Sequence, residues 1–107
     1  MTDGPQPISG RQLRRHEVTL LAAAYWPYEA IDDMVDIARL ESGWRTDAHN
    51  TTGEDSRGLW QVNAAAWPQY TNLNLFDPQI NAWCAYQVWK EQGYHAWYNS
   101  SKQLGLI

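Results

Sequence analysis

The sequence contains one cysteine, Cys84, and this shortage excludes several kinds of site. A single thiol cannot form an internal disulfide, and no spacing of cysteine and histidine is typical of a zinc site. Cys84 lies within a helical pattern, so we expect it to be a buried thiol. We therefore expect no metal and no cofactor.

Positive charge is also scarce. Eight lysines and arginines stand against twelve aspartates and glutamates, which gives a formal net charge of -4. A nucleic-acid binder normally presents a basic face, so this balance argues against DNA or RNA as a partner. It also provides no electrostatic attraction toward anionic cell walls or membranes.

Long apolar runs are missing from the sequence. No stretch is long enough to insert into a membrane, and residues 1–8 do not resemble a signal peptide because they are polar and rich in proline and glycine. We expect residues 1–8 to be a flexible lead-in and residues 9–107 to form one domain with a modest core. The chain is then cytoplasmic as written, a piece of a longer protein, or exported without such a signal.

Phenylalanine occurs once, whereas there are seven tryptophans and six tyrosines. Aromatic side chains with a polar edge suit a half-hydrated groove, and they also stack on sugar rings. Most of them nevertheless serve as core residues in helical domains. We expect this of Trp83 and Trp89, which belong to the apolar side of a long helix.

Apolar spacing and turn residues predict a mainly helical domain with one polar, irregular insert. The third of the predicted helices is the clearest, because Asp77 can cap it, Pro78 suits its first position and Gly93 follows its end. The predicted helices cover about residues 9–24 (capped by Ser9), 29–42 and 78–92. The remaining predictions are a loop or small β-hairpin over 45–57, a short strand or helix start over 59–62, a short helix over 64–67, and a helical turn or loop over 96–102.

One carboxylate stands out, because the apolar stripe of the second helix reaches Glu41 close to the end of that helix. Gly43 is well placed to cap the helix. A carboxylate there loses water on one side and faces the negative end of the helix dipole, and both effects raise its pKa. Acid-catalysed cleavage of a glycosidic bond needs such a protonated group. The alternative is a glutamate that turns out to solvent.

A second motif, Ser56-Arg57-Gly58-Leu59-Trp60-Gln61-Val62-Asn63, begins fifteen residues after Glu41. In order and spacing, Glu41-Ser42-Gly43, this motif, the segment 74–82 and Ala96-Trp97-Tyr98 resemble the lysozyme-like superfamily. Within it they are most similar to soluble lytic transglycosylase domains and their phage and actinobacterial cousins. The resemblance covers roughly residues 30–100. It implies an α+β, predominantly helical, lysozyme-like fold with a small irregular β insert.

The resemblance also implies roles for individual residues. Glu41 corresponds to the single catalytic glutamate of the family, while Ser56 and Gln61 line the site near it. Asn63 is expected to brace the turn. Tyr86 or Tyr98 would supply a tyrosine near the site, although the usual Tyr-Asn-x-Gly motif reads Tyr98-Asn99-Ser100-Ser101 here and lacks its glycine.

A second carboxylate is an open question. A hydrolase of the hen-egg type would carry an aspartate at the position of Ser56, and Asp55 and Glu54 lie next to it. Either would stabilise an oxocarbenium ion or position water if it pointed into the groove. We favour the alternative in which both belong to a solvated turn.

Two tryptophans, Trp44 and Trp60, flank the two motifs. Either at least one of them stacks on a sugar, or both pack around Glu41 and raise its pKa by desolvation.

The activity implied by the resemblance is cleavage of the β-1,4 bond between N-acetylmuramic acid and N-acetylglucosamine in peptidoglycan, by a lytic transglycosylase or a lysozyme-type muramidase. Glycan strands would be the partner of a domain that is monomeric in isolation. We expect it to belong to a larger phage or secreted protein, in a phage tail or outside the cell at the wall. The competing interpretations are a non-catalytic glycan-binding or structural module and an enzyme for a related glycan such as chitin.

Overall fold

The computed structural model describes residues 11–107, so the expectations for Ser9 and for residues 1–8 lie outside the described residues. The described chain forms α1 (Arg15–Ala23), α2 (Tyr28–Ser42), β1 (His49–Asn50), β2 (Ser56–Arg57), β3 (Val62–Asn63), η1 (Pro68–Tyr70), α3 (Pro78–Gln92), η2 (Gly93–Trp97) and α4 (Tyr98–Gln103), where η marks a 3₁₀ helix.

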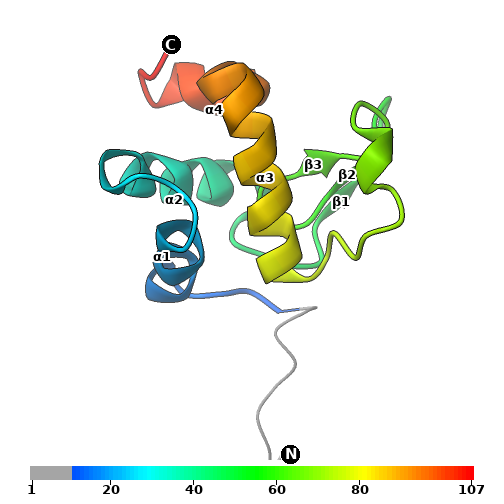
Figure 1. Ribbon diagram of the computed structural model, residues 1–107, viewed down its shortest axis with the longest axis horizontal. Coiled ribbons are helices and arrows are strands. Elements are labelled where there is room, and N and C mark those ends of the chain that lie inside the picture. Colours follow the sequence, from blue (N-terminus) through cyan, green and yellow to red (C-terminus); the bar gives the residue numbers. More distant parts are fainter. Residues whose placement is uncertain (1–10) are drawn as a thin grey trace, which may run out of the picture.

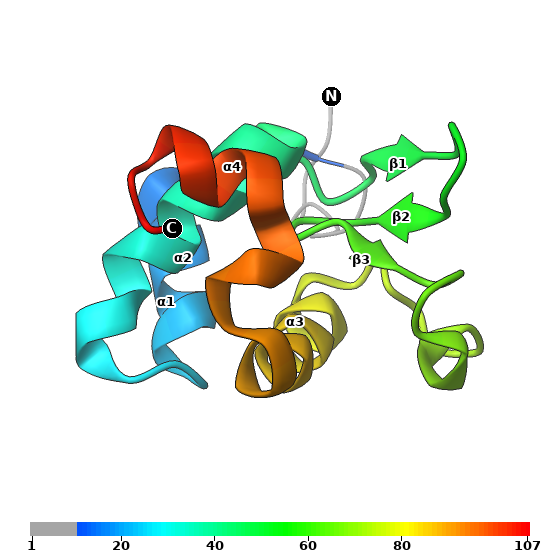
Figure 2. The same ribbon diagram turned by 90° about the horizontal axis from the view of Figure 1, so that it is seen from above.

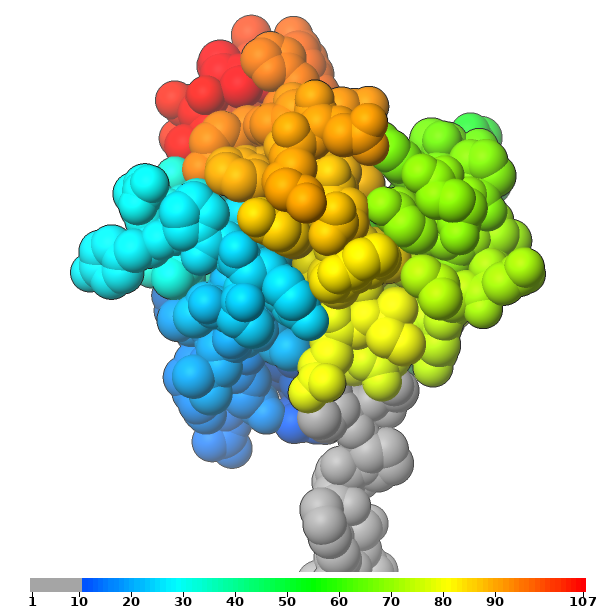
Figure 3. Space-filling model, in the orientation of Figure 1, coloured from blue at the N-terminus to red at the C-terminus, as the bar shows by residue number. Residues whose placement is uncertain are grey.

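The long helix α3 runs through the middle of the molecule, with α1 and α2 on one side and the small sheet and η1 on the other (Figure 1). The space-filling view shows α3 at the surface between these two groups (Figure 3). The three strands are antiparallel in the order β1-β2-β3. The predicted α+β, predominantly helical fold with a small β insert is confirmed.

Helix α2 matches its prediction closely, beginning at Tyr28 after Pro27. It ends at Gly43, whose φ of 63° is left-handed and whose N–H donates to the carbonyl of Arg39. Glycine adopts this conformation without a steric penalty, so the helix ends there. Glu41 therefore lies in the last turn, as the sequence indicates.

Helix α1 starts later than predicted, at Arg15. The preceding residues are extended because they pair with the chain that follows α2. Leu13 N–H donates to the Trp44 carbonyl at 2.8 Å, and Thr46 N–H donates to the Arg11 carbonyl at 3.0 Å. These bonds join the segment before α1 to the segment after α2.

Helix α3 has the predicted ends. The Asp77 carboxylate accepts hydrogen bonds from the N–H groups of Gln79 and Ile80, and Pro78 occupies the first helical position. Gly93 follows the last residue with a φ of 61°. The capping signals in the sequence were therefore sufficient to place both ends of this helix.

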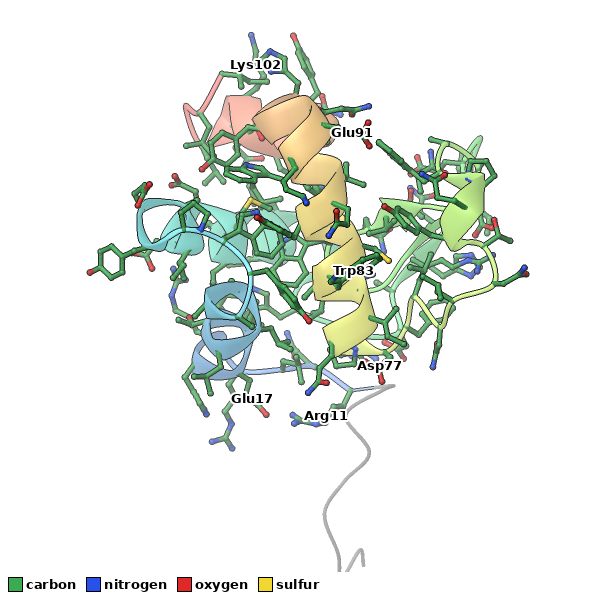
Figure 4. The ribbon with its side chains drawn as sticks, in the orientation of Figure 1. Arg11, Glu17, Asp77, Trp83, Glu91 and Lys102 are labelled. Atoms are coloured by element: carbon green, nitrogen blue, oxygen red, sulfur yellow. The ribbon has the colours of Figure 1, made fainter. Side chains whose placement is uncertain are left out.

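The predicted core position of Trp83 is wrong, since 42% of this residue is exposed on the outer side of α3 (Figure 4). It lies beside the buried stripe of the helix, and its ring meets Tyr70 edge-on at 6.1 Å. Trp89 is half-buried and packs against the core, while Cys84 is buried as expected.

The chain after β2 also differs from its prediction. Residues 59–61 form a turn, and β3 starts only at Val62. The predicted short helix over 64–67 is a single turn, in which Trp67 N–H donates to the Asn63 carbonyl at 3.0 Å. Pro68 disfavours a helical conformation at Trp67, and η1 starts at the proline instead.

One buried side chain, Asn81 of α3, holds the turn between β2 and β3. Its Oδ1 accepts from the Trp60 N–H at 2.9 Å, and its Nδ2 donates to the carbonyls of Arg57 and Leu75, both at 2.8 Å. A Cβ at Gly58 would lie 2.3 Å from the Leu75 carbonyl oxygen, and φ is +77° there. Only glycine fits this close approach.

Candidate active site

A polar cleft of about 340 Å³ lies where the end of α2, the small sheet and the junction of η2 and α4 meet. Figure 2 shows α4 next to α2, with the three strands to the right of both helices. The residues that line the cleft are Glu41, Asn50, Glu54, Ser56, Gln61, Asn63, Ala96, Trp97, Tyr98 and Asn99. Five of the predicted site residues, Glu41, Glu54, Ser56, Gln61 and Tyr98, are brought together here.

Glu41 is half-buried in the wall formed by α2, and the Ser100 hydroxyl donates to its Oε2 at 2.6 Å. Burial raises the pKa of Glu41, and the negative charge of Glu54 raises it further. The Ser100 hydrogen bond acts in the opposite direction, because it stabilises the charged form. The net pKa lies above the usual value, as an acid catalyst requires.

The two neighbouring carboxylates of the hairpin have different surroundings. Asp55 receives hydrogen bonds from Arg57 at 2.9 and 2.6 Å, and it pairs with His49 at 2.7 Å. Arg57 first, and His49 second, lower the pKa of Asp55 to about 2. Asp55 thus stabilises the hairpin and does not line the cleft.

Glu54 does line the cleft, whereas we expected it to belong to a solvated turn. The Ser56 hydroxyl donates to Glu54 Oε1, and the strand register pairs Ser56 with Asn50 and with Asn63. Ser56 is 3% exposed in the central strand of the sheet. This position directs Glu54 into the cleft rather than toward solvent.

Gln61 and Asn63 both hold the local backbone. Gln61 adopts a φ of 50°, and its Nε2 donates to the carbonyls of Ala48 and Gly58 at 3.1 and 3.0 Å. Asn63 Oδ1 accepts from the N–H groups of Asp55 and Ala65, so it braces the turn as expected. The resemblance implies that Gln61 lines the site, and the structure adds a bracing role for its side chain.

Trp44 and Trp60 pack and do not line the cleft. Trp60 is fully buried, and its indole N–H donates to the Met34 carbonyl at 2.9 Å. Trp44 is half-buried, with its indole N–H on the Val35 carbonyl at 3.0 Å. Both tryptophans therefore pack against α2, and their effect on the pKa of Glu41 stays a prediction.

Of the two candidate tyrosines, only one lines the cleft. Tyr86 stacks on Tyr25 and Trp89, at 6.1 and 6.2 Å, outside the cleft lining. Tyr98 lines the cleft and is 55% exposed. Tyr98 is therefore the tyrosine that a ligand in the cleft can contact.

Sequence reasoning did not assign Asn50, Ser100 or Trp97 to the site, although Asn50 and Trp97 line the cleft and Ser100 is bonded to Glu41. Ser100 occupies the variable position of the Tyr-Asn-x-Gly motif, which carries no signal for a partner of the acid. Trp97 lines the cleft, is 5% exposed and donates its indole N–H to the Trp60 carbonyl at 2.7 Å. The fragment Ala96-Trp97-Tyr98 was recognised as part of the motif set, and that was the only signal for Trp97.

Residues 11–107 contain neither a metal-binding cluster nor a membrane-spanning helix. In that part of the chain no group of three or more histidine, cysteine, aspartate or glutamate side chains is arranged to hold a metal ion. None of the helices described there has the length and apolar character needed to cross a membrane.

Comparison with protein families identifies a related domain. A family model described as a lysozyme-like domain matches residues 21–99, which include Glu41 and the whole Ser56–Asn63 motif. No curated protein and no solved structure matches the chain. The match covers well over half of the sequence, and we conclude that this chain belongs to the lysozyme-like domain family.

Proposed function

We propose that this domain cleaves the β-1,4 bond between N-acetylmuramic acid and N-acetylglucosamine in peptidoglycan, with Glu41 as the general acid. Membership of a lysozyme-like family indicates peptidoglycan cleavage in general. The observation that carries the proposal is a half-buried Glu41 with a raised pKa in the wall of a polar cleft.

The first chemical step follows from the surroundings of Glu41. Its raised pKa favours the protonated carboxyl, which can give this proton to the glycosidic oxygen as the C1–O bond breaks. Positive charge then develops at C1 of the muramyl ring. The Ser100 hydroxyl stabilises the carboxylate that Glu41 becomes, because it already donates to Oε2.

Two second steps complete the reaction. In hydrolysis, water attacks C1 and leaves a reducing end. In transglycosylation, the muramyl 6-hydroxyl attacks C1 and leaves a 1,6-anhydro end, with Glu41 accepting the hydroxyl proton. The products differ in mass by one water, so mass spectrometry of peptidoglycan digests distinguishes them.

The proposal is tested by Glu41→Gln in a cell-wall clearing assay. We expect the variant to fold, as judged by circular dichroism, and to lose about 10²-fold or more of the clearing rate. Glu91→Gln is a matched control, because Glu91 is exposed near the end of α3 and outside the cleft (Figure 4).

Clearing by folded Glu41→Gln at the wild-type rate would overturn the proposal. Equal binding of both proteins to cell walls, without clearing by either, would instead support a non-catalytic glycan-binding module. We extend the proposal to location: a domain with this activity would work at the bacterial wall, as part of a secreted protein or of a phage tail.

A further inference from the structure

Two carboxylates from different elements line the same cleft. Glu41 comes from the end of α2, and Glu54 comes from the loop between β1 and β2. The other titratable group in the lining is the Tyr98 hydroxyl, and no lysine, arginine or histidine among residues 11–107 lines this cleft. The charge of Glu54 is therefore not neutralised by a cation within it.

The surroundings of Glu54 leave one of its oxygens open to a ligand. Oε1 accepts the hydroxyl of Ser56, whereas Oε2 has no hydrogen-bond partner in the described part of the chain. Asp55, by contrast, has both oxygens occupied by Arg57 and His49. Of the two candidate carboxylates in the hairpin, only Glu54 is placed and free to hold a water in the cleft.

Ser56 gives this carboxylate a defined position. It is buried in the central strand, where it pairs with Asn50 on one side and Asn63 on the other. A hydroxyl anchored in this way restricts the rotation of the Glu54 side chain. Restricting a catalytic group before substrate binds reduces the entropy cost of reaching the reactive geometry.

We infer that Glu54 is the general base of a hydrolytic reaction in this cleft and that Ser56 is its positioning residue. The inference rests on the proposed role of Glu41 as the acid. Glu41 gives its proton to the leaving glycosidic oxygen as the C1–O bond breaks. A water held at Glu54 forms the new bond to C1 and gives its proton to Glu54. The products are a reducing muramyl end and a free 4-hydroxyl on the departing glucosamine, and exchange with solvent restores both carboxyl groups.

Transglycosylation by a single glutamate needs no second carboxylate, because the muramyl 6-hydroxyl replaces water and Glu41 accepts its proton. A base at Glu54 gives a different product. We therefore expect wild-type digests of purified peptidoglycan to contain reducing muramyl ends, each one water heavier than an anhydro end.

Glu54→Gln, with Glu91→Gln as the matched control, separates a base from a structural residue. We expect Glu54→Gln to lower kcat by about 10²-fold or more with little change in KM, because proton transfer is lost and binding is kept. Glu91→Gln is expected to match the wild type. Sodium azide, which attacks C1 without a general base, should restore cleavage by Glu54→Ala and give a muramyl azide.

Ser56 is tested through the same rate constants. We expect Ser56→Ala to lower kcat at constant KM, and Ser56→Thr to recover part of the loss because it keeps the hydroxyl. A fall in melting temperature without this recovery would show that Ser56 is merely structural.

Three results would overturn the role of Glu54. They are anhydro ends from the wild type, a folded Glu54→Gln with kcat within about threefold of wild type, and a slow Glu54→Ala that azide does not restore. The first result, anhydro ends, leaves the role of Glu41 intact and refutes only the role of Glu54 as a base. A wild-type protein that cleaves no peptidoglycan would refute the proposed function itself, and with it this inference.

Discussion

Replacing Asn81 with alanine should lower the free energy of unfolding more than the same replacement at any other asparagine or glutamine in the described chain. The side chain is fully buried, and its three hydrogen bonds satisfy the Trp60 N–H and the carbonyls of Arg57 and Leu75. A buried polar group that loses its partner costs about 1–3 kcal/mol. Three such groups, one of them only partly buried, give about 3–5 kcal/mol.

That loss is large beside the whole stability of a domain of this size, which is typically about 5–15 kcal/mol. Urea unfolding followed by circular dichroism measures it. With a slope of about 2 kcal/mol per molar urea, the midpoint should fall by about 1.5–2.5 M. Native-state hydrogen exchange should show the Trp60 amide losing protection, because Asn81 is its acceptor.

Asn72→Ala is the matched control, because Asn72 is exposed after η1 and should change stability by less than about 0.5 kcal/mol. A loss below about 1 kcal/mol for Asn81→Ala, or a Trp60 amide that remains protected, would refute the reasoning. Either result would mean that water or a shifted backbone satisfies the three groups.

Four further predictions concern the site and its support. Gly58→Ala should cost about 2–3 kcal/mol in urea unfolding, because its Cβ would approach the Leu75 carbonyl oxygen to 2.3 Å at a φ of +77°. Glu41→Gln should be more stable than wild type at pH 7, by on the order of 1 kcal/mol. The raised folded-state pKa means that ionisation above the unfolded value of 4.5 opposes folding, so melting temperatures of the two proteins should converge near pH 4. Asp55 has a lowered pKa of about 2, so its contribution is present above the unfolded value of 3.8 and is lost as pH falls toward 2. Between these two pH values the Asp55→Asn variant should lose less stability than the wild type, and urea midpoints measured at several pH values will show the difference. Ser100→Ala removes the donor that lowers the pKa of Glu41, so the basic limb of the kcat/KM profile should move to higher pH.

The parts of the fold that the sequence predicts are those with local signals. Gly43, Asp77 and Pro78 mark helix ends through their own backbone preferences, and an apolar stripe places Glu41 on the inner face of α2. None of these needs knowledge of distant residues. The start of α1 was missed because it depends on pairing with the chain after α2, which no local pattern shows.

The site residues that sequence reasoning missed or assigned differently depend on long-range contacts. Ser100 reaches Glu41 across 59 residues, and Trp60 reaches Met34 across 26. Glu54 lies beside strands of two residues, whose register cannot be determined from turn-forming residues alone. Whether such a carboxylate faces solvent or a cleft changes with a shift of one residue in register.

The indole hydrogen bonds have a consequence for how the cleft moves. Trp97 is bonded to the Trp60 carbonyl, and Trp60 is bonded to the Met34 carbonyl, so η2, the β2–β3 turn and α2 share one buried chain of contacts. Moving η2 away from α2 would break one of these bonds, so we expect such motion on the timescale of local unfolding rather than of loop movement. We therefore expect the wall of the cleft formed by η2 to hold its position, so that a bound polymer strand would adapt its own conformation to it.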